Sequence, residues 1–189
     1  MLKKIKKNFK VHLGCGHRFI PGFIHIDINK YKHIDYTSDI KKLHMFNNKT
    51  VDLIYACHVL EYFDNKEVYQ VLKEWKRVLK KNGILRLSVP NFDSIIKIYK
   101  KYKDINYIGI KGPMYGQWKN KKTGEFMYHK NIYNFITLKD VLKKNGYKDI
   151  KKYNWKKTEH AMVDDYSQAY VPHMDQKGIL LSLNVEARK

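Results

Sequence analysis

The sequence lacks the features that would place it in a membrane or in an oxidising compartment. No apolar run approaches the ~20 residues that a membrane-spanning helix requires. The basic stretch from Met1 to Lys10 is not followed by the apolar segment of a signal peptide. The two cysteines, Cys15 and Cys57, do not form a Cys-x-x-Cys spacing, which disfavours a disulfide framework or a metal site. These absences predict a cytoplasmic protein without a metal and with small, inert cysteine side chains.

Arginine is scarce as well, although the formal net charge is +20. The excess of positive charge comes from lysines that are scattered through every segment. Specific recognition of phosphates and bases relies on the forked guanidinium of arginine. The charge is therefore interpreted as compositional bias, and a nucleic-acid substrate is kept only as an alternative. The arginines are Arg18, Arg77, Arg86 and Arg188.

The chain also has no internal repeat and no linker rich in proline, glycine or serine. Its 189 residues, 43% of them hydrophobic, suit one domain with a real core, predicted to span residues 1–189. Strand-like and helix-like segments alternate along the chain. That alternation predicts an α/β fold with a mostly parallel sheet.

Hydrophobic periodicity and turn residues predict the individual elements. The clearest helix begins at the capping pair Asp64 and Glu67 and ends before Gly83. Thr137 and Asp140 are the expected capping pair of the last helix. Segments near 104–134 and 156–177 are predicted to be irregular and to serve the acceptor, because long structureless loops in a compact domain are usually functional. Strands are expected at 9–13, 23–28, 34–36, 51–56, 84–89, 147–155 and 179–187, and further helices at 92–102 and 137–145.

A glycine pair at the end of the first predicted strand suggests a ligand that contains adenosine. Gly14 and Gly16 allow close approach of the backbone, and Asp27 at the end of the next strand can accept hydrogen bonds from ribose hydroxyls. A dinucleotide fits less well, because Phe19 stands where the third glycine is needed. The 13 residues from Gly14 to Asp27 are also fewer than the usual ~20. The pattern therefore favours a ligand without a pyrophosphate.

Three motifs in residues 11–90 resemble those of class I S-adenosylmethionine-dependent methyltransferases, in the same order and spacing. They are Val11 to Gly16, Val51 to Tyr62, and Arg77 to Leu85. In the C-terminal half, Asp165 to Ser167 and Ser182 to Ala187 resemble a group of small predicted methyltransferases of the type 11 kind. Members of that group are often associated with cell-surface glycan pathways. The resemblance implies a Rossmann-like class I methyltransferase fold with a seven-stranded, mostly parallel sheet flanked by helices.

The resemblance also implies S-adenosylmethionine as the cofactor, S-adenosylhomocysteine as the product, and a set of cofactor-binding residues. Gly14, Cys15 and Gly16 would pass beneath the methionine part, Asp27 would hold the ribose, and Ile28 would pack on the adenine. Asp39 and Ile40 would contact the adenine edge, while Ala56 and His58 would lie beside the sulfonium. Arg18 is the candidate partner for the methionine carboxylate, because the link from Gly16 to Phe23 shortens the usual first helix. Two plainer interpretations stay open: Asp39 as a helix cap and His58 as a pocket-wall histidine.

The expected reaction is methyl transfer to a small-molecule acceptor, interpreted as an anionic metabolite or a sugar. Lys111 and Lys119 lie in an irregular segment and suit an anionic acceptor. His129 is the first candidate for a base and His58 the second, because histidine titrates closest to neutral pH. The alternatives are a nucleic-acid methyltransferase and a cofactor-binding partner protein without catalysis.

Overall fold

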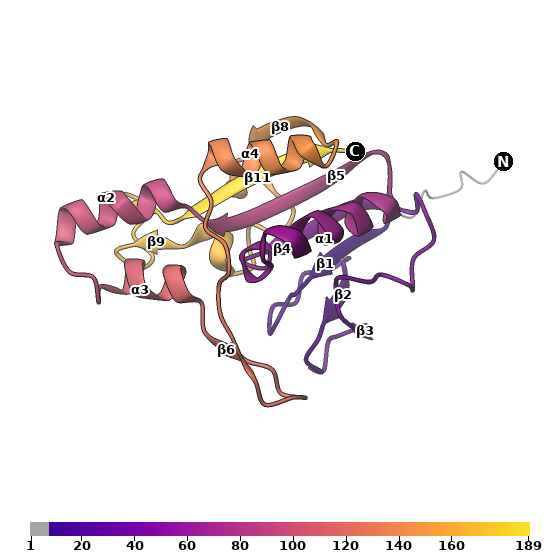
Figure 1. Cartoon of the computed structure of the whole chain (residues 1–189), viewed down its shortest axis with the longest axis horizontal. Helices are drawn as coiled ribbons and strands as arrows, with labels where there is room; N and C mark the ends of the chain where they lie inside the picture. Colours follow the sequence, from indigo (N-terminus) through magenta and orange to yellow (C-terminus); the bar gives the residue numbers. More distant parts are fainter. Residues whose placement is uncertain (1–7) are drawn as a thin grey trace.

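The computed structural model describes residues 8–189, apart from the side chain of Ile108, so most of the predicted basic stretch lies outside the described residues. The main sheet has seven strands in the order β3-β2-β1-β4-β5-β11-β8 (Figure 1). Every pairing is parallel except those of β11, which runs antiparallel to β5 and β8. The seven-stranded, mostly parallel sheet is therefore confirmed. Its strands are β1 (Lys10–Leu13), β2 (Ile24–Asp27), β3 (Tyr36–Thr37), β4 (Val51–Cys57), β5 (Leu79–Pro90), β8 (Lys148–Lys152) and β11 (Ser182–Arg188).

The strand order reverses at β1, which pairs with both β2 and β4. In open α/β sheets, ligands bind outside the carboxyl ends of the strands at such a point, because the connections diverge to opposite sides there. Gly14 follows β1 and His58 follows β4, so both residues lie at this edge.

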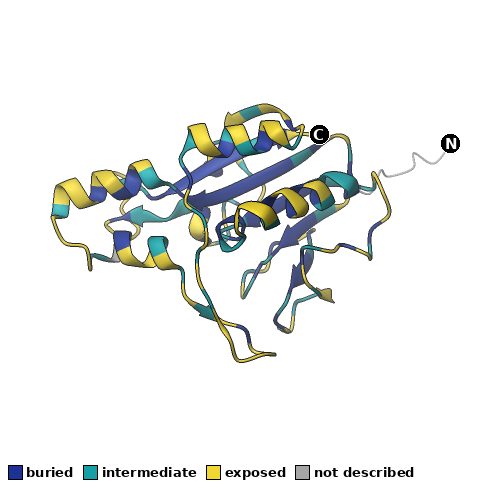
Figure 2. Ribbon diagram, viewed as in Figure 1, coloured by how far each residue is buried: buried dark blue, intermediate teal, exposed yellow. Residues whose placement is uncertain are grey.

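Helices α1 (Asn65–Val78) and α4 (Phe135–Lys144) lie on the same side of the sheet (Figure 1). Asp64 caps α1 in the predicted capping box with Glu67. The helix buries one apolar face, and Figure 2 shows its buried side turned toward the strands. The main core joins this face to β1, β4 and β5. The buried residues of the helix are Val68, Val71, Leu72, Trp75 and Val78.

A second, smaller core includes Leu53 and Tyr55 of β4, residues that alternate with the main-core residues Ile54 and Ala56. Three buried histidines belong to this region: His12, His25 and His160. His160 stacks on Tyr55 with ring centroids 4.2 Å apart, and His12 lies 5.1 Å from the same ring. This side of the sheet is therefore largely aromatic.

Two predicted helix boundaries are wrong. α1 ends at Val78 and does not extend to the turn at Gly83, because Leu79 already pairs with Val51 as the first residue of β5. The left-handed backbone of this turn belongs to Asn82, with φ of 63°. α4 begins two residues earlier than predicted, because Asn134 caps it in a capping box with Thr137.

The predicted irregular segments are partly ordered, which corrects the prediction for residues 104–134. That segment holds a helix and a short hairpin, and the chain then returns to the sheet at Tyr133, which bridges to Asn91. Within the described residues, no helix has the length and apolar character needed to cross a membrane. The remaining elements are α2 (Phe92–Tyr102), α3 (Ile108–Tyr115), β6 (Trp118–Lys119), β7 (Phe126–Met127), β9 (Tyr170–Val171), β10 (Ile179–Leu180), and short 3-10 turns at Leu60–Tyr62, Trp155–Lys157 and Tyr166–Gln168.

Candidate active site

The glycine loop after β1 has the backbone that its sequence requires. Gly14 and Gly16 have φ of 60° and 54°, values that a side chain disfavours. A Cβ on Gly14 would lie 2.6 Å from the Val59 side chain, so the loop packs tightly there. A Cβ on Gly16 would meet no atom within 4 Å, so this glycine faces open space. The second glycine is thus free to let a ligand approach the backbone.

Asp27 lies beside this open space at the end of β2. Its carboxylate accepts the backbone N–H of Gly16 at 2.8 Å through one oxygen and that of Asn29 at 2.8 Å through the other. Two bonds leave lone pairs free on both oxygens, because a carboxylate has about four acceptor positions. Asp27 is therefore fixed in place and still able to accept from two vicinal hydroxyls, as a ribose requires.

The residues expected at the adenine edge have structural partners of their own. Asp39 accepts the backbone N–H of Lys41 at 2.9 Å within a turn, and because no helix follows it, the interpretation of Asp39 as a helix cap is wrong. The carbonyl of Ile40 accepts the indole N–H of Trp75 at 2.9 Å. Ala56 is only 1% exposed and packs in the main core beneath the glycine loop, whereas Ile28 is half-buried.

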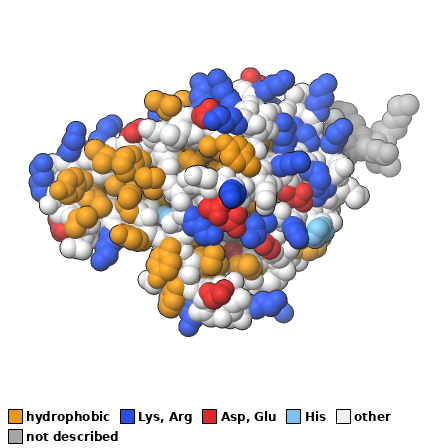
Figure 3. All heavy atoms as spheres, viewed as in Figure 1, with side chains coloured by type: hydrophobic (Ala, Val, Ile, Leu, Met, Phe, Trp, Pro, Cys, Tyr) orange, Lys and Arg blue, Asp and Glu red, His pale blue; other side chains and the backbone are white. Residues whose placement is uncertain are grey.

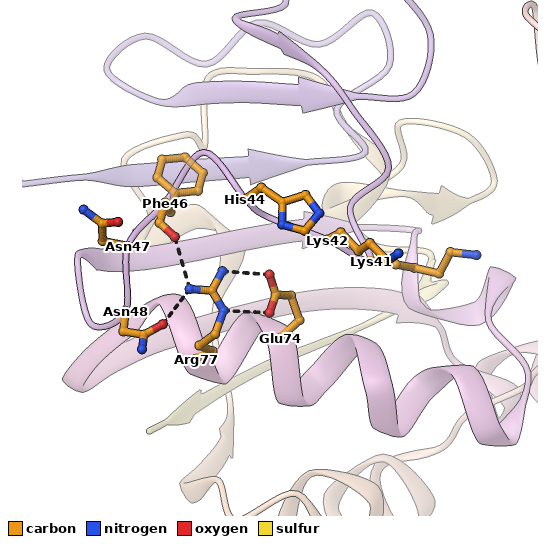
Figure 4. A pocket seen from close by; sticks show the side chains of 8 residues that line it. All are labelled: Lys41, Lys42, His44, Phe46, Asn47, Asn48, Glu74 and Arg77. Carbon is orange, nitrogen blue, oxygen red and sulfur yellow. Dashed lines mark hydrogen bonds and ion pairs between the residues drawn. The ribbon is translucent and has the colours of Figure 1, made fainter.

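A hollow of about 750 Å³ lies between the loop that follows Ile40 and α1 (Figure 4). Its lysines and Arg77 give it a basic lining. Arg77 directs all of its N–H donors to protein acceptors, namely Glu74, Asn48 Oδ1, and the carbonyls of Phe46 and Leu43. Arg77 therefore anchors this loop on α1 and has no donor left for a ligand.

Arg18, the candidate for the methionine carboxylate, connects the glycine loop to the C-terminal part of the chain. Its Nε donates to the Asp164 carbonyl at 3.3 Å, and its guanidinium lies 4.8 Å from the centre of the Tyr166 ring. Tyr166 in turn lies 5.0 Å from the His58 ring. The structure thus brings Arg18 and His58 to the same tyrosine.

The two histidines predicted as bases lie around a carboxyl group that the sequence analysis did not single out. Glu61 is 1% exposed, and its Oε1 lies 3.7 Å from His58 Nδ1 and 3.7 Å from His129 Nε2. Within the described residues, neither oxygen of Glu61 has a hydrogen-bond partner. The available signal was a lone carboxylate in the apolar run from Val59 to Phe63, three residues after His58. We call His58, Glu61 and His129 the Glu61 group.

Neighbouring hydrogen bonds determine which nitrogen of each histidine carries the proton. His129 Nδ1 lies 2.8 Å from the Pro113 carbonyl, which can only accept, so Nδ1 is protonated and Nε2 has the lone pair. Ser182 donates its hydroxyl proton to the Tyr166 carbonyl, so it accepts from His58 Nε2 at 2.8 Å. The lone pair of His58 is then on Nδ1. Both imidazole lone pairs therefore face Glu61.

Burial controls the charge of the Glu61 group, because a buried site disfavours every ionised form. Burial raises the pKa of Glu61 to about 8 and lowers the pKa of His58 to about 3. Burial also lowers the pKa of His129, against the opposing effect of the Pro113 hydrogen bond. At neutral pH the group therefore contains a protonated carboxyl and two neutral imidazoles. His58 also has φ of 52°, an uncommon backbone conformation for a residue with a side chain.

The cysteines show no sign of chemical activity. Cys15 is buried, and its thiol donates to the Ile26 carbonyl at 3.8 Å. Burial, followed by the nearby charge of Asp27, raises the pKa of the Cys15 thiol to about 12. A thiol with such a pKa stays protonated at neutral pH and is a poor nucleophile. Among the described residues, no group of histidine, cysteine and carboxylate side chains has the arrangement of a metal site.

Comparison with known proteins finds a matching domain and a shared fold. Residues 19–87 match the model of the methyltransferase domain family, a region that includes Asp27 and the Glu61 segment. No curated protein sequence matches the chain. Solved structures similar in fold include an S-adenosylmethionine-dependent methyltransferase from Archaeoglobus fulgidus, with TM-score 0.59, 16% identity, and coverage of 96% of this chain and 86% of that one.

Two further structures have the same fold. An S-adenosylmethionine-dependent methyltransferase from Mesorhizobium loti has TM-score 0.52 and 15% identity, covering 96% of this chain and 90% of that one. The 1,6-didemethyltoxoflavin-N1-methyltransferase of Burkholderia thailandensis, solved with its substrate and S-adenosylhomocysteine, has TM-score 0.55 and 12% identity, covering 96% and 70%. Residues 19–87 thus match a methyltransferase domain, and the chain shares the fold of class I methyltransferases; together these findings support an S-adenosylmethionine-dependent methyltransferase with S-adenosylmethionine as its cofactor.

Proposed function

We propose that the enzyme methylates a small-molecule acceptor whose reacting hydroxyl or amine lies beside the Glu61 group. The observation that carries this proposal is the convergence of two imidazole lone pairs on a buried, protonated carboxyl at the carboxyl edge of the sheet. Unpaired buried polar groups are costly, so their persistence at a binding edge favours a functional role. The fixed carboxylate of Asp27 and the open space at Gly16 support cofactor binding next to it.

The cofactor supplies an electrophilic methyl group on a sulfonium, and the protein positions the acceptor in line with it. A hydroxyl or ammonium acceptor must also lose a proton. We infer that the carboxyl proton of Glu61 passes to the lone pair of His58 or His129, which forms an imidazolium 3.7 Å from Glu61, and that the resulting carboxylate takes the proton of the acceptor. Glu61 can then release this proton to solvent, and its carboxylate balances the imidazolium charge. The group thus accepts a proton without leaving an isolated charge in a buried site.

The acceptor is proposed to be an anionic metabolite or a sugar, in a cytoplasmic protein of one domain. Lys111 and Lys119 were the lysines expected to attract an anion. Lys119, on β6, lies with its Nζ 5.7 Å from the Phe126 ring, and Lys111 lines a groove beside α3. Lys111 is therefore the better candidate for contact with an anionic acceptor.

Cofactor binding is tested by calorimetry with S-adenosylhomocysteine. Asp27→Ala should weaken binding by about 1.5–3 kcal/mol, the usual contribution of hydrogen bonds to a charged group. Asp140→Ala is the matched control, because its carboxylate forms an exposed ion pair with Lys144 on α4, and cofactor binding by this variant should change far less. Equal losses in the two variants, or tight binding of NAD by the unaltered enzyme, would reject the proposed cofactor site.

Catalysis is tested by an acceptor screen with labelled S-adenosylmethionine. Once an acceptor is known, His58→Gln and His129→Gln are compared for turnover and for S-adenosylhomocysteine affinity. Loss of turnover at unchanged affinity supports the proton-transfer role, and unchanged turnover in both variants refutes it. Binding of S-adenosylhomocysteine without turnover of any acceptor in the screen favours a cofactor-binding partner protein without catalysis. RNA or DNA binding that survives physiological salt favours the nucleic-acid alternative.

A further inference from the structure

A groove with a mainly apolar lining lies between α2 and α3. Its volume is about 440 Å³, which is in the range of small-molecule sites. On α2, the lining residues recur at helical spacing, so one stripe of that helix forms a wall. Ile105 and Asn106, in the connection between the helices, line the groove as well. The remaining apolar lining includes Phe92, Ile96, Tyr99, Ile110, Met114 and Tyr115.

Several of these side chains are unusually exposed for their type. Ile105 is 67% exposed and Tyr115 is 62% exposed, and Tyr99 is 45% exposed. Figure 3 shows apolar side chains gathered over the end of the molecule formed by α2 and α3, with lysines around them. Scattered apolar residues on a surface need no explanation, but a contiguous group marks a site of ligand or partner binding.

The groove is joined to the Glu61 group by the end of α3. The Pro113 carbonyl accepts from His129 Nδ1 at 2.8 Å, and the Tyr115 carbonyl accepts from the His129 backbone N–H at 2.9 Å. Tyr62 donates its hydroxyl to the carbonyl of Gly116, the residue that follows α3. Phe92, at the start of α2, donates its N–H at 2.9 Å to the carbonyl of Tyr133. A ligand in the groove would therefore end close to His129.

The charge of the groove points to the chemistry of its occupant. Lys111 belongs to the lining, and the lining contains no Asp or Glu. Further lysines, Lys97, Lys100, Lys101 and Lys103, lie on or just after α2. An apolar surface with a cationic group inside it is complementary to an apolar body that carries an acid. The methylene stem of the lysine side chain can also pack along such a ligand, while its ammonium group contacts the acid.

We propose that the groove binds the apolar chain or ring of an anionic amphiphile, which is the methyl acceptor, with its acidic group on Lys111. This inference rests on the proposed function and narrows the acceptor from an anionic metabolite to one with an extended apolar part. The acceptor atom reaches the Glu61 group past the end of α3. A second copy of the chain fits less well, because a stable protein interface needs about 800 Å² from each partner, far more than one small-molecule groove offers.

Decanoate is the probe, and decanol is its uncharged counterpart. Each is titrated into the full-length protein below its micelle-forming concentration, with the imidazole C–H signals of His129 and His160 followed by NMR. Decanoate should bind saturably and shift the His129 signal, while the signal of His160 on the other face of the sheet stays in place. No saturable binding, or equal shifts at both histidines, would overturn the proposal.

Substitutions then locate the site. Ile96→Gln and Tyr115→Ser should each weaken decanoate about tenfold, the effect of losing roughly 1.4 kcal/mol of apolar contact. Lys111→Gln should weaken decanoate several-fold and leave decanol unchanged. Ile136→Gln and Lys139→Gln, both on α4, are the matched controls, since neither residue lines the groove. Decanoate affinity that is unaffected by the groove variants, or that falls as much in the controls, would refute the assignment.

Two further measurements separate this inference from the proposed function. S-adenosylhomocysteine affinity should stay within twofold of the unaltered enzyme in every groove variant. Cofactor binding without decanoate binding removes the groove proposal alone, whereas decanoate binding without cofactor binding removes the methyl-transfer role and the acceptor assignment with it. The oligomeric state, measured by sedimentation, is the last test. A dimer that dissociates on the substitution Ile96→Gln would assign the groove to a second copy of the chain instead.

Discussion

Two groups of histidines lie in this enzyme, one half-buried and one buried, and they differ in what surrounds their rings. His58 and His129 direct lone pairs toward Glu61 at 3.7 Å. His12 and His160 pack against Tyr55, and His25 stacks on Phe19 with centroids 5.0 Å apart. Burial lowers the pKa in both groups, so a low pKa by itself does not distinguish a site from a core. The distinguishing feature is the convergence of lone pairs on one buried carboxyl.

The substitution Glu61→Gln should separate the two groups of histidines most strongly. The amide of glutamine has the shape of the protonated carboxyl and can donate to the same imidazole lone pairs, but it cannot ionise. We expect turnover to fall about 10²–10⁴-fold, the usual range for general acid–base catalysis. S-adenosylhomocysteine affinity, measured by calorimetry, should stay within twofold. The matched variant His160→Gln alters the histidine that stacks on Tyr55 and should retain most of the turnover.

Glu61 should also make the folded enzyme less stable at alkaline pH. Its pKa is about 8 in the folded state and 4.5 as the reference, so the folded state holds a proton that the unfolded state loses. The free energy of unfolding therefore falls as pH rises from 4.5 to 8. Glu61→Gln removes this dependence. Between these pH values we therefore expect the free energy of unfolding of the variant to rise by about 3–5 kcal/mol relative to that of the wild type. Urea denaturation at pH 5 and pH 8.5 measures the difference, and parallel curves for the two proteins would contradict it.

His160, which stacks on Tyr55, should give the free energy of unfolding the opposite pH dependence. Burial lowers the pKa of His160 from 6.5 to about 4, with Asp165, Arg86 and Glu159 acting on it in opposing directions. The unfolded state therefore binds a proton first, and stability is lost as pH falls from 6.5 toward 4. The expected loss from His160 is about 3 kcal/mol. His160→Gln should flatten this part of the urea midpoint profile, and profiles of equal slope in the variant and the wild type would contradict the assignment.

The smallest expected effect concerns the tautomer of His58. Ser182→Ala removes the oxygen that accepts from His58 Nε2, so the imidazole is no longer fixed with its lone pair toward Glu61. We expect turnover to fall about tenfold or less and stability by about 1 kcal/mol, the usual contribution of one hydrogen bond. The ¹⁵N shifts of the His58 ring nitrogens report the tautomer. An unchanged tautomer with reduced turnover would assign the loss to packing instead.

The features that the sequence predicted correctly are those that follow from the local pattern of strands and turns. Gly14, Gly16 and Asp27 follow strands directly, so their places at the sheet edge could be read from the chain. The capping box of α1 was also local. The seven-stranded, mostly parallel sheet was implied by the family resemblance and is confirmed, whereas the order of its strands is seen only in the structure.

The remaining features depend on contacts between distant residues, which no local pattern reveals. α3 and the β6–β7 hairpin are short and hold few apolar residues of regular spacing, so residues 104–134 looked irregular. The partners of Glu61 lie 3 and 68 positions away in the chain, and only the fold brings His129 to it. His129 and His58 were predicted separately, and their common partner was found only in three dimensions.

Asn29 has a consequence for the order of binding. Its backbone N–H supports Asp27, and its side-chain oxygen accepts the backbone N–H of Lys121 at 2.9 Å, in the turn of the β6–β7 hairpin. The two ends of that hairpin, Gly116 and His129, lie at the Glu61 group. The hairpin is thus attached at Asp27, the carboxylate proposed to hold the ribose, and at the Glu61 group, where the acceptor is proposed to bind. A cofactor that tightens the Asp27 end would set the position of the hairpin before the acceptor arrives, which corresponds to an ordered kinetic mechanism with the cofactor first.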